Sequence, residues 1–132
     1  MKDKIIIIGT GKEAEIFLYH YRDVYDVLLF ADENPRRHSF RGKSVVVLES
    51  IIDHLDGRYK IIVATPVEEY KNISRKLYKH KFVEFQDFIY YKAINKKIAI
   101  FLGNCQNQSL KFFMENIKEF TKEYWIYPYP AI

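Results

Sequence analysis

Short apolar runs alternate with amphipathic stretches over the first 94 residues of the chain. The first run, 5–8, consists of four isoleucines, which is typical of a strand buried on both faces of a parallel sheet. Similar runs predict further strands at 25–31, 44–48, 59–64 and 81–85. Helices are predicted at 12–22 and 66–78, and shorter helical segments at 49–55 and 87–94. This alternation predicts an α/β fold with a doubly wound parallel sheet.

The second long helix has a clear start signal. Thr65 is a candidate cap, Pro66 suits the first turn, and Glu68 would complete a capping box. Helical spacing predicts that its inward-facing residues are Val67, Tyr70, Ser74, Leu77 and Tyr78.

The same alternation of elements begins again after a predicted joint at 95–97. A strand is predicted at 97–102, a helix at 107–120 and an extended segment at 123–127. One β-α-β unit is too small to bury its own faces, so it either docks on the first sheet or begins a second α/β domain, and we favour the second alternative. We therefore divide the chain into domains 1–94 and 95–132, and we favour the interpretation that it is an N-terminal piece of a longer protein.

The composition limits the protein class. A hydrophobic share of 48% in 132 residues argues for a folded core rather than disorder. No apolar run approaches the roughly 20 residues that a membrane span requires, and the apolar run near the N-terminus is too short for a signal peptide. We therefore expect a cytoplasmic protein without a membrane span.

Charge and side-chain chemistry exclude several kinds of partner. The net charge of +4 is compatible with phosphate-bearing ligands but too small to indicate nucleic acid. The 11 tyrosines and 10 phenylalanines fall mostly at core-compatible positions, so we expect no nucleic-acid partner. The single cysteine excludes an internal disulfide, and the scattered histidines predict no metal site.

A glycine-rich turn follows the first strand. Its sequence is Gly9-Thr10-Gly11-Lys12-Glu13-Ala14, a G-x-G-x-x-A pattern between a predicted strand and a predicted helix. The glycines permit a tight turn and a close backbone approach, and the helix N–H groups favour an anion such as phosphate. Glu13 more often compensates the helix dipole, and it would repel a diphosphate.

Polar residues at the ends of three predicted strands are candidate ligand contacts. Asp32 lies about 20 residues past the glycines, where a carboxylate accepts hydrogen bonds from a ribose diol. A guanidinium such as that of Arg36 matches two phosphate oxygens. The alternative, that Asp32 only ends its strand and that the arginines belong to a solvated loop, stays open. The candidate ligand-binding residues are Gly9, Thr10, Gly11, Lys12, Asp32, Asn34, Arg36 and Thr65.

These residues resemble a known group of proteins. The matching segments are the glycine turn, Phe30-Ala31-Asp32-Glu33-Asn34-Pro35, Gly42 with Val45-Val46, and Ile61-Ile62-Val63-Ala64-Thr65-Pro66. They resemble the Rossmann-like N-terminal domain of bacterial polysaccharide-biosynthesis proteins, which includes the PglD-type sugar acetyltransferases and CoA-binding-like domains. The resemblance implies a nucleotide or a UDP-sugar as the ligand, with Gly9, Gly11 and Asp32 at the site.

A second resemblance covers the last third of the chain. The segment Gly103-Asn104-Cys105-Gln106 resembles the opening motif of WcbI-type capsular polysaccharide acetyltransferases, a family associated with coenzyme A. A thiol at a strand-to-helix turn lies near helix N–H groups, which lower its pKa and also stabilise an oxyanion. The candidate catalytic residues are therefore Cys105, Asn104 and Gln106, with coenzyme A or acetyl-CoA as the cofactor of this segment. An ordinary buried cysteine is the alternative.

Together these features predict a nucleotide- or sugar-nucleotide-binding domain of a cell-surface polysaccharide biosynthesis protein, an acetyl- or acyltransferase that acts on glycans. One alternative is an NAD(P)-dependent oxidoreductase, although no Tyr-x-x-x-Lys pair lies in a suitable place. Another is a non-catalytic Rossmann-like module for regulation or assembly. The expected partner is a small nucleotide or sugar ligand, and a homo-oligomer stays open.

Overall fold

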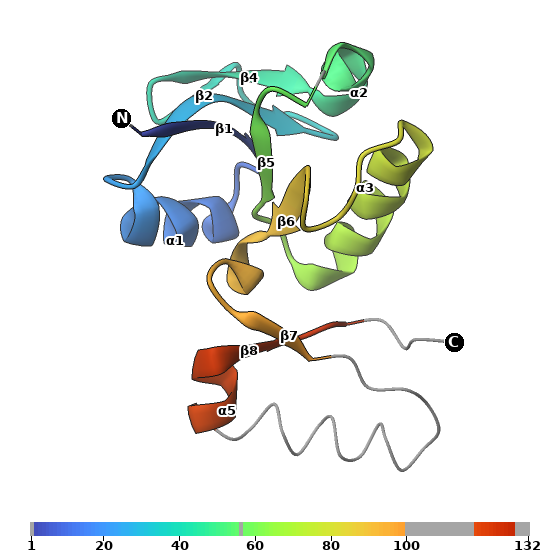
Figure 1. The fold of residues 1–132 in the computed structure, drawn as a ribbon. Helices are drawn as coiled ribbons and strands as arrows, with labels where there is room; N and C mark the ends of the chain where they lie inside the picture. Colours follow the sequence, from blue (N-terminus) through green and yellow to red (C-terminus); the bar gives the residue numbers. More distant parts are fainter. Residues whose placement is uncertain (1, 56, 100–117, 129–132) are drawn as a thin grey trace. The chain divides into compact units, whose positions relative to one another are not determined.

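The computed structural model describes residues 2–55, 57–99 and 118–128, and the chain divides into two compact units, Met1–Tyr91 and Lys92–Ile132. Figure 1 shows the ribbon of both units. The elements of the first unit are β1 (Asp3–Ile8), α1 (Lys12–Tyr21), β2 (Tyr25–Asp32), β3 (Ser39–Phe40), β4 (Lys43–Val47), α2 (Leu48–Ile51), the 3-10 helix Ile52–His54, β5 (Lys60–Val63), α3 (Val67–Lys79) and β6 (Phe88–Tyr90). The 3-10 helix Tyr91–Ala93 follows.

The first unit is built on one six-stranded sheet of order β3-β4-β2-β1-β5-β6. All neighbouring strands are parallel except β3, which pairs antiparallel with β4 at the edge. The isoleucines of β1 occupy the centre, between β2 and β5, and each is no more than 2% exposed. Burial on both faces explains why this strand is a continuous apolar run rather than an alternating one.

Helices cover both faces of this sheet. From β1 the chain proceeds to β2 and β4 in one direction, and from β5 to β6 in the other. Because parallel crossovers are right-handed, α1 and α3 must lie on opposite faces, as Figure 1 shows. The prediction of an α/β fold with a doubly wound, mostly parallel sheet is confirmed.

The prediction of a strand at 81–85 is wrong. Lys81 and Phe85 have positive φ values of 69° and 70°, which an extended strand does not allow. The edge strand is instead β6, within the segment 87–94 that was expected to be helical, and Phe88 is fully buried. The periodicity of a short apolar run does not distinguish a strand from a helical turn. The sequence therefore predicts the strand in the run 81–85 and not in the next run, 87–94, where the structure has it.

A short hairpin joins β4, which the sequence predicts, to the edge strand β3, which it does not predict. Ser39 pairs with Ser44 and Phe40 with Lys43 around a two-residue turn. Both turn residues, Arg41 and Gly42, have positive φ values, 50° and 79°, which is the requirement of a type I′ turn. Phe40 is buried and packs edge-on against the ring of Phe30, at 4.9 Å between centroids.

Helix α3 begins without the predicted capping box. Pro66 occupies the N-cap position, and no side chain caps the helix. The Thr65 hydroxyl donates to the Pro66 carbonyl oxygen at 3.1 Å instead, because the threonine lies one residue too early. Tyr78 is 51% exposed rather than inward-facing, whereas Tyr70, Ser74 and Leu77 are buried as predicted.

The second unit contains β7 (Lys97–Ala99) and β8 (Tyr124–Ile126), which pair in parallel, and α5 (Lys118–Glu123). The order β7-α5-β8 agrees with the predicted β-α-β unit, while most of the predicted helix at 107–120 lies outside the described residues. That this unit begins a second α/β domain stays a prediction.

A buried carboxylate joins α3 to the segment before β6. Glu84 is only 8% exposed, and the Tyr70 hydroxyl, from a fully buried side chain, donates to its Oε2. The Tyr78 hydroxyl donates to Oε1 at 3.3 Å from a half-exposed position. Burying a carboxylate costs free energy unless hydrogen-bond donors compensate it, so these tyrosines hold the segment against α3.

We predict that Tyr70→Phe lowers the free energy of unfolding by about 1–3 kcal/mol, because it takes a buried donor from a buried charged acceptor. Tyr78→Phe is the matched control and should cost less than about 1 kcal/mol, since water reaches this hydroxyl. Urea denaturation at pH 7 measures both. Equal losses in the two variants would contradict this account.

Candidate functional site

A cleft of about 600 Å³ opens at the carboxyl ends of β1, β2 and β5. This is the edge where the strand order reverses direction, the usual position of ligand sites in doubly wound sheets. The cleft is lined by Ile8, Gly9, Thr10, Gly11, Glu13, Asp32, Glu33, Asn34, Arg36, Arg37, Ala64, Thr65, Pro66, Glu69 and Ile73.

The first glycine of the turn is required by the fold. Gly9 has φ +120°, and a Cβ at this position would lie 2.2 Å from the carbonyl oxygen of Ala64. The Gly9 N–H also donates to the Ala31 carbonyl oxygen at 2.8 Å. Gly9 therefore lets the end of β1 lie tightly between β2 and β5.

The second glycine has no such requirement. Gly11 has φ −100° and ψ −153°, an extended conformation that other residues adopt. A Cβ on Gly11 would meet only Glu13 Oε2, at 3.8 Å, among the described residues. The space above Gly11 belongs to the cleft, so neither backbone conformation nor packing requires a glycine here.

Asp32 links the glycine turn to the end of β2. The Thr10 hydroxyl donates to its Oδ2 at 2.7 Å, and the Asn34 N–H donates to its Oδ1 at 3.2 Å. These bonds fix the carboxylate within the cleft. A carboxylate has about four acceptor positions, so Asp32 retains acceptor capacity for a ligand hydroxyl.

The structure brings most of the predicted ligand-binding residues together. Those that line the cleft are Gly9, Thr10, Gly11, Asp32, Asn34, Arg36 and Thr65. Lys12, in contrast, is exposed and does not line it. Thr65 contributes a wall rather than an available donor, since its hydroxyl donates to the Pro66 carbonyl oxygen. The predicted catalytic residues Asn104, Cys105 and Gln106 lie outside the described residues.

Glu69 lines the cleft although the sequence does not single it out, and together with Glu33, from the segment after β2, it adds acidic groups to the lining. The pKa of Glu69 is raised, first by partial burial and then by the negative charges of Asp32, Glu33, Glu13 and Glu68. Glu69 lies in the first turn of α3, directly after the strand end that contributes to the cleft. The sequence signal that could have identified Glu69 is its place in the first turn of the predicted helix.

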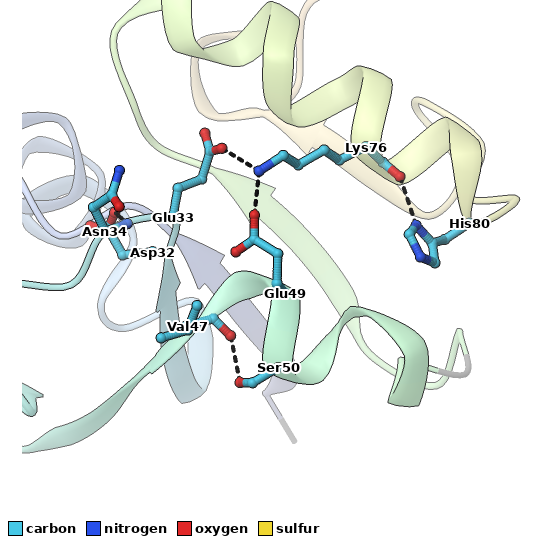
Figure 2. A network of polar contacts seen from close by, with 8 residues as sticks. All are labelled: Asp32, Glu33, Asn34, Val47, Glu49, Ser50, Lys76 and His80. Atoms are coloured by element: carbon cyan, nitrogen blue, oxygen red, sulfur yellow. Dashed lines mark hydrogen bonds and ion pairs between the residues drawn. The ribbon is translucent and has the colours of Figure 1, made fainter.

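A lysine from α3 offsets one of these carboxylates (Figure 2). The ammonium of Lys76 lies 2.5 Å from Glu33 Oε2, and it also contacts Glu49 at the start of α2. Hydrogen bonds to Glu33 and Glu49 raise the pKa of Lys76, and the bond to Lys76 lowers the pKa of Glu49. The network orients Glu33 and joins α3 to the ends of β2 and β4.

No protein-family model matches the sequence, and no curated protein matches it. The chain is similar in structure to RSP, a Rex-family repressor, with 18% identity and a TM-score of 0.49 over 67% of this chain and 51% of that chain. For RSP in complex with β-NADH the identity is 17% and the TM-score 0.48, over 89% of this chain and 60% of that chain. For the acetyltransferase domain of PglB from Neisseria gonorrhoeae, in complex with acetyl coenzyme A, the identity is 13% and the TM-score 0.48, over 79% of this chain and 51% of that chain.

The chain thus spans about half to three fifths of the length of these structures. Likenesses of this size carry no conclusion about ligands. Among the helices that the structure describes, none is long and apolar enough to cross a membrane. Within the same described residues, no three His, Cys, Asp or Glu side chains are placed to hold a metal ion.

We predict that alanine substitutions at the two glycines of the turn change the stability by very different amounts. Gly9→Ala should lower the free energy of unfolding by at least about 3 kcal/mol, since it combines a clash with Ala64 and an unfavourable φ. Gly11→Ala should change it by less than about 1 kcal/mol. Chemical denaturation of both variants tests this, and a Gly9→Ala variant as stable as Gly11→Ala would contradict the turn geometry.

Proposed function

We propose that the cleft binds a nucleotide or a nucleotide-like cofactor. The observation that carries this proposal is the open space above Gly11, next to the fixed carboxylate of Asp32. A volume of about 600 Å³ lies in the range of small-molecule sites. A ribose diol donates two hydrogen bonds to a carboxylate, as Asp32 can accept.

The candidate ligands differ in the group that they offer to Asp32. UDP-sugars and NAD(H) carry a free ribose diol, whereas coenzyme A carries a phosphate on its ribose. A carboxylate accepts from hydroxyl groups and repels phosphate, so the cleft favours UDP-sugars or NAD(H) over coenzyme A.

Ligand binding should stabilise the protein against heat. At a ligand concentration of 100 times Kd the expected gain is about 2.7 kcal/mol, which raises the Tm of a domain of this size by roughly 10–20 °C. Titration with UDP-sugars, NAD(H) and coenzyme A, followed by thermal shift, measures it.

Gly11→Val should abolish this shift by filling the space above the turn, while Lys12→Ala, a neighbour outside the cleft lining, should leave it unchanged. The absence of a shift with every ligand would contradict the proposal.

We further propose that the domain belongs to an acetyl- or acyltransferase of polysaccharide biosynthesis, a PglD-like domain followed by a WcbI-like segment. The support is the sequence Gly103-Asn104-Cys105-Gln106 after the first unit. In this proposal the Cys105 thiolate attacks the acyl carbonyl of acetyl-CoA and expels the coenzyme A thiolate. A glycan hydroxyl then attacks the Cys105 thioester: its oxygen takes the acyl group, its proton passes to the coenzyme A thiolate, and the Cys105 thiolate is released.

Cys105→Ser should reduce acyl transfer by the full-length protein at least about 100-fold, since a serine hydroxyl without an activating base is a weak nucleophile. Acetyl transfer from acetyl-CoA to a glycan acceptor is the measurement, and the thermal shift with UDP-sugar serves as the control for folding. An unchanged transfer rate would rule out a nucleophilic thiol. Hydride transfer with NAD(H) would instead support an oxidoreductase.

A further inference from the structure

Charges of opposite sign lie on different elements around the cleft. Glu13 is in the first turn of α1 and Glu69 in the first turn of α3. The basic residues Arg36 and Arg37 belong to the loop between β2 and β3. All four residues line the cleft, together with Asp32 and Glu33. Glu33 is paired with Lys76, whereas Asp32 accepts a hydrogen bond from Thr10 in the glycine turn. We therefore group Asp32 with Glu13 and Glu69 as the acidic part of the cleft, and Arg36 and Arg37 form its basic part.

The acidic part surrounds the glycine turn. A helix N-terminus carries about half a positive charge, which attracts phosphate in many glycine-turn sites. Here Glu13 lies in the first turn of α1, Asp32 accepts a hydrogen bond from Thr10 in the glycine turn, and Glu69 lines the same cleft. Partial burial raises the pKa of Glu69, and the charges of Asp32, Glu33 and Glu13 raise it further. Carboxylates at this place oppose the half charge of the helix end and disfavour a diphosphate at the turn.

The basic part offers a better position for phosphate. A guanidinium presents donors that match two phosphate oxygens. The guanidinium carbon of Arg37 lies 5.2 Å from the ring centroid of Phe40, a buried side chain, which restricts the arginine before a ligand binds.

We propose that the cleft binds its nucleotide with the phosphates against Arg36 and Arg37 and with the uncharged sugar and base toward Glu13 and Glu69. This orientation rests on the proposed nucleotide-binding function. Carboxylates accept hydrogen bonds from hydroxyl groups and exocyclic amines, so the acidic part becomes a recognition surface for the nucleoside. The cleft then selects against ligands that need a phosphate at the glycine turn.

Two double variants and two pairs of ligands test the orientation. Calorimetric titration with adenosine and ADP, and with uridine and UDP, is performed on the unmodified protein, Arg36→Gln/Arg37→Gln and Glu13→Gln/Glu69→Gln. Arg41→Gln and Glu68→Gln are matched controls, because each removes a nearby charge that does not line the cleft. Thermal denaturation without ligand verifies that each variant is folded.

Arg36→Gln/Arg37→Gln should weaken the affinity for the nucleoside diphosphate at least about tenfold, since charge-assisted bonds to phosphate are lost. The affinity for the nucleoside should stay within about twofold. Glu13→Gln/Glu69→Gln should weaken nucleoside and diphosphate by similar factors. The reverse result overturns the orientation: a diphosphate that binds about tenfold tighter to the glutamine pair and is insensitive to the arginine substitutions lies at the glycine turn.

The outcomes also separate this inference from the function on which it rests. If none of the four ligands binds the unmodified protein, the nucleotide-binding proposal fails. If they bind, and the arginine substitutions leave the diphosphate affinity unchanged, the nucleotide-binding proposal stands and the orientation fails.

Discussion

The close contact between Gly9 and Ala64 determines the geometry at the carboxyl ends of the central strands, where the cleft opens. The Ala64 N–H donates to the Ile8 carbonyl oxygen at 2.8 Å, and the Gly9 N–H donates to Ala31 at the same distance. The end of β1 is therefore held between β2 and β5 by its own backbone. Since the residues that follow these strands start from fixed positions, the side chains of Thr10 and Asp32 meet within hydrogen-bond distance.

The same edge concentrates helix starts and therefore acidic side chains. Acidic residues in a first helical turn stabilise the helix through its dipole, as Glu13 does in α1 and Glu69 in α3. Each acidic residue is favourable for its own helix. Because the two helices begin at one cleft, the acidic side chains accumulate there. Lys76 offsets the charge of Glu33 from outside the cleft lining. The pKa of Glu69 is raised first by its partial burial and then by the charges of Asp32, Glu33, Glu13 and Glu68.

The sequence predicts the centre of the sheet well and its edges poorly. The strands β1, β2, β4 and β5 are apolar runs bounded by polar turns, and the central strands β1 and β5 bury their apolar residues on both faces of the sheet. The edge strands β3 and β6 depend on backbone conformations at Arg41, Lys81 and Phe85, whose residue types do not indicate a positive φ. The position of Asp32 follows from topology. That Glu13 and Glu69 line the same cleft depends on how α1 and α3 pack, although each lies in the first turn of its helix, which the sequence does indicate.

The two glycines of the turn separate what the fold needs from what a ligand needs. Gly9 is explained by its positive φ and by the carbonyl oxygen of Ala64, so its presence would be expected even in a protein without a ligand. Gly11 is explained by neither backbone conformation nor packing, and a side chain here would project into the cleft. A G-x-G pattern alone therefore indicates the strand-to-helix turn, and only its second glycine faces open space in the cleft. In the proposed orientation this space receives the uncharged nucleoside, and the phosphates lie away from Glu13 and Glu69.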